Sequence, residues 1–95
     1  MTVKQIRALG LDWPGSDSVE QYAVESGGNV DLDATLEALR RGLEVYQGQL
    51  NDMQNFQRRW NADVGDRQGE VATKAAEMRR GIELVETIHE KTRSA

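Results

Sequence analysis

The chain has 95 residues, of which 16 are acidic and 12 are basic, so its formal net charge is -4. This length allows one small domain, and the absence of cysteine excludes disulfides and cysteine-ligated metal sites. Nucleic-acid binding draws on clustered Lys and Arg, whereas the arginine pairs of this chain are dispersed among glutamates, so no nucleic-acid partner is expected.

The chain is poor in large apolar residues. Leu, Ile, Val and Phe number 20 of 95, just above the level of disordered chains. So thin a core favours stabilisation by self-association or by a partner. No apolar run approaches the roughly 20 residues that span a bilayer, and the N-terminus has no apolar core of a signal peptide. We expect no membrane span, and a protein that is cytoplasmic or exported without a cleaved signal peptide.

Residues 1–30 predict one or two short helices. Thr2 and Gln5 fit a capping box for the first helix, which Gly10 ends. The sequence "DWPGSDS" (12–18) predicts a turn, and a second short helix follows with Ser16 or Ser18 as its cap. Two adjacent glycines in "ESGGN" (25–29) end that helix. Helices this short need to dock on another element to be stable.

Residues 31–60 carry a heptad pattern of apolar residues, which predicts a long helix with coiled-coil-like packing. Asp31 or Asp33 is its candidate cap. The pattern comprises Leu32, Leu36, Leu39, Leu43, Tyr46, Leu50, Met53 and Trp60. A second segment repeats the pattern, and its members are Val71, Ala75, Met78, Ile82, Val85 and His89. Both segments are therefore expected to be helical.

The joint between these segments decides the architecture. Its sequence, "NADVGDRQG" (61–69), is rich in poor helix formers, and its two glycines cost about 2 kcal/mol relative to alanine. We predict a turn near 61–66, marked by Trp60 and Gly65, with Trp60 packing against the end of the hairpin. The alternative is one continuous rod of roughly 90 Å, which the near-continuous apolar pattern also permits. The predicted fold is thus all-α, an antiparallel hairpin over 31–95 onto which 1–30 docks.

Four apolar residues lie outside the seam between the two long helices: Val45, Phe56, Leu84 and Ile88. In one interpretation, they form a partner interface. In the other, the N-terminal third folds back and covers this second stripe with Ile6, Leu9, Leu11 and Trp13. Both hold if the N-terminal segment is released on binding.

Catalytic chemistry is not expected. Glu86 and His89 form half of a di-iron carboxylate motif, but the first long helix offers no inward glutamate to complete it, and His89 is expected at the open end of the hairpin. The chain has no cysteine, and no serine has a histidine placed to activate it as a nucleophile. We predict no enzyme activity, no cofactor and no metal, although a metal-dependent enzyme using Glu86 and His89 stays as a minor alternative.

At Trp60 the chain resembles the WxG family of type VII secretion substrates, which are small, acidic helical hairpins with a tryptophan at the bend. The resemblance covers 31–92 and implies pairing into four-helix dimers and export in folded form. The family's Trp-x-Gly turn reads Trp60-Asn61-Ala62 here, and the next glycine is Gly65. "WPG" (13–15) also fits that string but precedes the long helices. The predicted architecture is also similar to that of type III export chaperones, which are small helical hairpins as well.

The apolar pattern therefore favours a helical protein–protein interaction module, and the resemblance implies that it serves a bacterial secretion system as a substrate or a chaperone. It would act as a dimer with itself or with another small helical protein. The alternative function is a structural coiled-coil rod or spacer.

Overall fold

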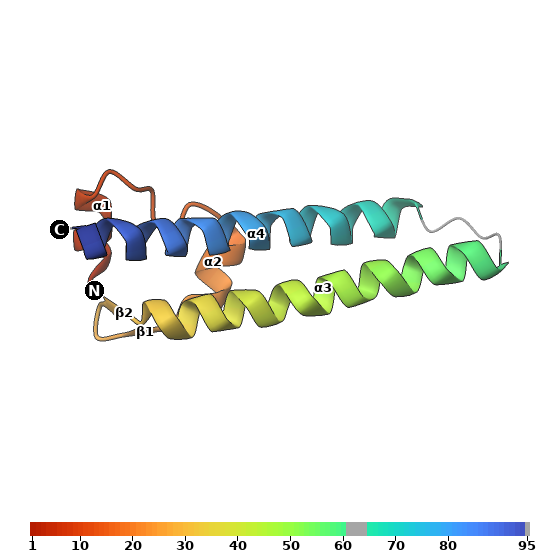
Figure 1. Cartoon of the computed structure of the whole chain (residues 1–95), viewed down its shortest axis with the longest axis horizontal. Coiled ribbons are helices and arrows are strands. Elements are labelled where there is room, and N and C mark those ends of the chain that lie inside the picture. Colours follow the sequence, from red (N-terminus) through yellow and green to blue (C-terminus); the bar gives the residue numbers. More distant parts are fainter. Residues whose placement is uncertain (61–64, 95) are drawn as a thin grey trace.

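The structure of the chain is a computed structural model that describes residues 1–60 and 65–94. Two long antiparallel helices lie side by side and are preceded by two short helices and a small β-hairpin (Figure 1). The elements in chain order are α1 (Val3–Ala8), α2 (Asp17–Tyr22), β1 (Glu25–Ser26), β2 (Asn29–Val30), α3 (Leu32–Trp60) and α4 (Gly65–Ser94). The predicted all-α hairpin is confirmed. The molecule is 53 Å long, so the rod of roughly 90 Å is wrong.

The core forms where α3 and α4 pack on the N-terminal elements. Leu39 of α3 and Met78 and Val85 of α4 are fully buried, as their places in the heptad pattern predict. The other seam residues of α3 are only partly buried: Leu32, Leu36, Leu43, Tyr46, Leu50 and Met53. On α3 the seam residues are thus fully buried only in the half that the N-terminal elements cover, whereas on α4 Val71 and Ala75 are also buried in the other half.

Local capping starts three of the helices as the sequence predicts. The Thr2 hydroxyl accepts from the Gln5 amide at 3.1 Å, and the Gln5 side chain accepts from the Thr2 amide at 2.9 Å. Ser16 accepts from the amide of Val19 and so caps α2. Asp31 accepts from the amide of Ala34 at 3.0 Å at the start of α3. Each bond satisfies an amide that the first helical turn leaves without a partner.

The prediction that the glycine pair ends the second short helix is wrong, because α2 ends at Tyr22 and the glycines lie beyond it in a β-hairpin. Gly27 and Gly28 have φ angles of 58° and 82°, and they form the two-residue turn between the antiparallel strands β1 and β2. Positive φ at both central residues is the requirement of the hairpin turn that matches strand twist. Just before this hairpin, the Val24 amide donates to the Thr35 hydroxyl at 2.9 Å. Thr35 is completely buried, so this bond fixes the hairpin to α3.

The N-terminal third folds back onto the long helices. Ile6, Trp13 and Val19 are buried in one cluster with Ile88, and Leu84 is partly buried against the same cluster. The Lys91 ammonium donates to the carbonyl of Leu9 at 3.3 Å, which ties the end of α1 to the end of α4. The expected docking of residues 1–30 on the hairpin is therefore what the structure has.

The predicted role of Trp60 is wrong. Trp60 is the last residue of α3, and its side chain is 65% exposed instead of packing against the hairpin end. Gly65 is already the first residue of α4. The remaining part of the predicted turn, 61–64, lies outside the described residues. Within the described chain, no helix has the length and apolar character to cross a membrane.

Candidate interaction surface

Among the described residues, the half of the hairpin away from the chain termini contains only α3 and α4, because the short helices and strands all lie toward the other end (Figure 1). Two helices alone leave the edges of the seam between them open to solvent. Among the described residues of α3, accordingly, none after Gly42 is fully buried. On α4 the covered positions in this half are Val71 and Ala75. This half of the molecule keeps apolar surface in contact with water.

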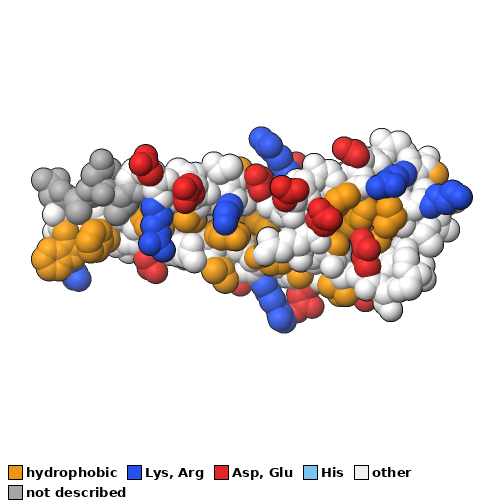
Figure 2. Space-filling view, turned by 180° about the vertical axis from the view of Figure 1, so that it is seen from behind, with side chains coloured by type: hydrophobic (Ala, Val, Ile, Leu, Met, Phe, Trp, Pro, Cys, Tyr) orange, Lys and Arg blue, Asp and Glu red, His pale blue; other side chains and the backbone are white. Residues whose placement is uncertain are grey.

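Three large apolar side chains of α3 project from the hairpin. Val45 is 58% exposed, Phe56 48% and Trp60 65%. Figure 2 shows hydrophobic side chains reaching the surface at the hairpin tip, beside the residues drawn in grey. Contiguous exposed apolar side chains mark interaction sites more often than single ones do. The exposure of Phe56 and Trp60 at one end therefore identifies the tip as a candidate contact region.

The predicted partner interface is divided by the structure. Val45 and Phe56 are exposed, as that prediction requires. Ile88 is completely buried and Leu84 is partly buried, because the N-terminal third covers α4 at those positions. The interpretation that placed all four on one free surface is corrected in this respect: the stripe on α4 belongs to the core of the chain.

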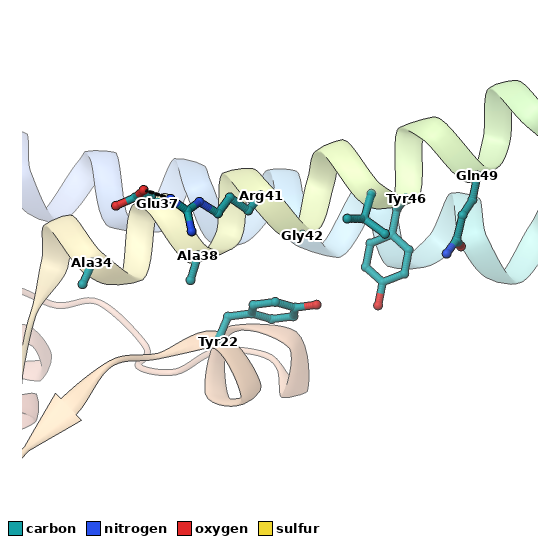
Figure 3. Close-up of a pocket in the computed structure, with 9 residues that line it drawn as sticks. Tyr22, Ala34, Glu37, Ala38, Arg41, Gly42, Tyr46 and Gln49 are labelled. Atoms are coloured by element: carbon teal, nitrogen blue, oxygen red, sulfur yellow. Dashed lines mark hydrogen bonds and ion pairs between the residues drawn. The ribbon is translucent and has the colours of Figure 1, made fainter.

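A hollow of about 570 Å³ runs along α3 beside Val45, and the sequence analysis missed it. Its floor consists of the small residues Ala34, Ala38 and Gly42, and Tyr22 of α2 forms one wall (Figure 3). The sequence contains the signal, since three small residues recur at steps of four and so share one helix face. They lie outside the heptad seam. The heptad pattern is carried by large apolar residues, so a stripe of small residues does not stand out beside it.

Tyr22 and Tyr46 border this hollow together. Burial raises the pKa of Tyr22 above its ordinary value of 10.0, and the hydrogen bond with Tyr46 acts in the same direction, while the charge of Lys74 acts against it. The Lys74 ammonium lies 6.0 Å from the centre of the Tyr46 ring, at the outer limit of a cation–π contact. The Tyr22 hydroxyl in the wall of the hollow thus stays protonated at physiological pH, and it can donate or accept a hydrogen bond.

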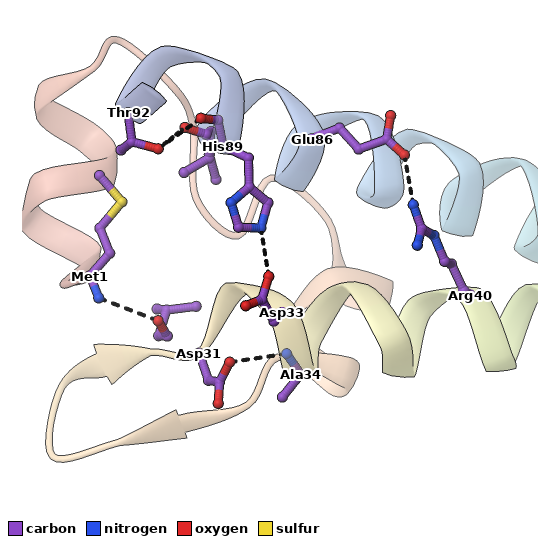
Figure 4. A network of polar contacts seen from close by, with 10 residues as sticks. Met1, Asp31, Asp33, Ala34, Arg40, Glu86, His89 and Thr92 are labelled. Atoms are coloured by element: carbon purple, nitrogen blue, oxygen red, sulfur yellow. Dashed lines mark hydrogen bonds and ion pairs between the residues drawn. The ribbon is translucent and has the colours of Figure 1, made fainter. Parts of the chain in front are cut away.

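Polar contacts gather at the other end of the hairpin. His89 lies there, as expected, with its Nε2 3.2 Å from Oδ1 of Asp33, and Arg40 pairs with Glu86 at 3.3 Å (Figure 4). Both contacts bridge α3 to α4, and the exposed Arg40–Glu86 ion pair contributes at most about 1 kcal/mol. In the described part of the chain, no group of three or more His, Cys, Asp or Glu residues could hold a metal ion. The Glu86–His89 motif is therefore engaged in bridging the two helices.

Comparison with known proteins adds no relative. No family model matches the chain, and neither a curated protein nor a solved structure matches it.

Proposed function

We propose that this protein is a helical protein–protein interaction module, whose hairpin pairs with another small helical chain to complete a bundle. The observation that carries the proposal is the half-open seam of α3, with Val45, Phe56 and Trp60 exposed beyond it. Complete burial of such a side chain contributes roughly 1.5–3 kcal/mol. A partner helix packed along α3 would bury these side chains. Because the core of the chain is thin, this burial would add substantially to its stability.

The charge of the chain is consistent with a protein partner. A net charge of -4 is unfavourable next to the phosphates of nucleic acid. The exposed face of α3 carries both signs, with the Glu37–Arg41 ion pair at its edge. Mixed charge around an apolar strip is the usual composition of a protein interface rim.

We further propose, from the resemblance at Trp60, that the module belongs to a bacterial secretion system as a substrate or as a chaperone. The supporting features are a cysteine-free acidic chain, the hairpin fold and a tryptophan at the end of α3. An exposed tryptophan at a hairpin tip is available for recognition, as a buried one would not be. The motif itself departs from Trp-x-Gly, so the proposal stands on the architecture.

The double variant Val45→Glu/Phe56→Glu tests the interaction module. We expect it to remain helical and to lose association, because two carboxylates replace apolar contacts in a desolvated interface. The matched control is Gln47→Glu/Asn51→Glu, which adds the same charge at two exposed positions of the same helix. Molar mass over a concentration series measures self-association. Photocrosslinking in cells from position 56 detects any other partner.

The proposal fails if the chain is monomeric at all concentrations and position 56 crosslinks to nothing. It also fails if the double variant associates as well as its control.

A further inference from the structure

Beside the seam, α3 carries a second stripe, in which small residues that are buried or partly buried precede large apolar residues that are exposed. Ala38 and Phe56 are 18 residues apart, as are Gly42 and Trp60, and 18 residues make five helical turns. Each pair therefore projects from one side of the helix. Val45 lies between them. The hollow over Ala34, Ala38 and Gly42 is followed along this stripe by a second one, of about 650 Å³, bordered by Phe56 and Trp60.

Side-chain size changes along this stripe in one direction. Its first half is small: Ala34 and Ala38 floor a hollow, and Gly42 at the end of that hollow is buried against Met78 and Tyr22. Its second half carries Phe56 and Trp60, which project into solvent. One half thus offers space, and the other offers large apolar groups without a place to pack. The two halves complement each other, but they lie on the same straight helix and cannot meet within one chain.

We propose that the occupant of this face is a second copy of the chain, with the two α3 helices antiparallel about a two-fold axis near residue 47. This inference rests on the proposed function and names its partner. About that point Phe56 lies nine positions after the axis and Ala38 nine before it. Trp60 and Ala34 are thirteen positions away on opposite sides. In a two-fold interface each contact occurs twice, so both aromatic residues of each copy enter the hollow of the other.

Charges on the flank of the stripe agree with this register. Arg41 lies six positions before the axis and Asp52 five after it, so the arginine of one copy faces the aspartate of the other. Glu37, ten positions before, falls near Arg59, twelve after. A parallel pairing would instead place each of these charges beside its own copy, where like charges repel. Size and charge thus select the same antiparallel arrangement.

Cysteine crosslinking tests the register, because the natural chain has no cysteine. Ala38→Cys and Phe56→Cys are prepared separately and then mixed under mild oxidation. A disulfide needs Cα atoms within about 7 Å. In the proposed pair, position 38 of one copy faces position 56 of the other, whereas identical positions are roughly 27 Å apart along the helix. We expect disulfide-linked dimers in the mixture and none from either variant alone. Gln47→Cys mixed with Phe56→Cys is the misplaced control.

A charge exchange provides a second readout that keeps the apolar residues intact. Asp52→Arg should raise the dimer dissociation constant by about tenfold, and Arg41→Asp combined with Asp52→Arg should restore it. Crosslinking of each single cysteine variant with itself, or a dimer without the 38–56 crosslink, would overturn the register. A monomeric chain whose position 56 crosslinks to a different protein would overturn self-pairing and leave the proposed function standing. A chain that neither dimerises nor crosslinks to a different protein would contradict the proposed function as well.

Discussion

At the scale of single residues, Gly81 shows how closely the short helix α2 approaches α4. Gly81 is buried, and a Cβ placed on it would lie 2.7 Å from a methyl group of Val19 and 3.3 Å from Leu39. The side chain of Val19 is stiff at χ1, so it cannot turn away. The missing methyl group of Gly81 is thus what allows α2 to lie against the long helices.

Replacing Gly81 with alanine is therefore expected to destabilise the protein, although alanine is the better helix former. The helix gains about 1 kcal/mol, but the overpacking at Val19 costs about 1–3 kcal/mol. Gly48→Ala is the matched control, because nothing lies within 4 Å of a Cβ at that position, and it should stabilise α3 by about 0.5–1 kcal/mol. Chemical denaturation measures both. Equal stabilisation by the two substitutions would contradict the close approach of α2.

At the scale of elements, the small β-hairpin holds the backbone between α2 and α3. Val30 donates its amide to the Met1 carbonyl at 2.6 Å, and Asp31 donates to Val24 at 2.8 Å. The hairpin thus connects the N-terminus, the end of α2 and the start of α3. Its geometry depends on the two glycines of its turn.

Gly28→Ala should cost about 1–2 kcal/mol, because a Cβ is unfavourable in the left-handed region and φ at this position is 82°. Gly27→Asn is the control: φ is 58° there, and asparagine followed by glycine is a preferred pair for this turn. It should leave stability nearly unchanged. Thermal unfolding compares the two variants. A hairpin that tolerated Gly28→Ala as readily as Gly27→Asn would not require positive φ at its second turn residue.

The long helices were predictable from the sequence because their apolar residues recur with one period over many turns. The capping residues Thr2, Ser16 and Asp31 were predictable because their bonds are local. The β-hairpin was not, since strands of two residues have no periodicity to detect. The burial of Ile88 was left open between two interpretations, because sequence spacing does not tell which surface a distant segment covers. The hollow on α3 was not predicted, because the small residues that floor it do not contribute to the pattern of large apolar residues.

At the scale of the whole molecule, the proposed dimer has a shape that scattering can test. The axis near residue 47 lies close to the middle of α3 (Leu32–Trp60), so the two hairpins overlap along most of their length. The maximum dimension of the dimer should therefore stay near the 53 Å of one chain plus its hydration shell. A pair joined only through Phe56 and Trp60 at the tips would be nearly twice as long. Small-angle X-ray scattering with molar mass from the same column run distinguishes the two.

Both ends of the described chain lie at the same end of the hairpin (Figure 1), and this determines how the molecule responds to mechanical load. A force applied between α1 and the end of α4 peels contacts apart one after another, beginning with the bond from Lys91 to Leu9. No step requires many contacts to shear together. The N-terminal third comes away first and uncovers Ile88, and only then do α3 and α4 separate. A chain built in this way is expected to yield stepwise to a weak pull between its two ends, so it would offer little mechanical resistance to unfolding under load.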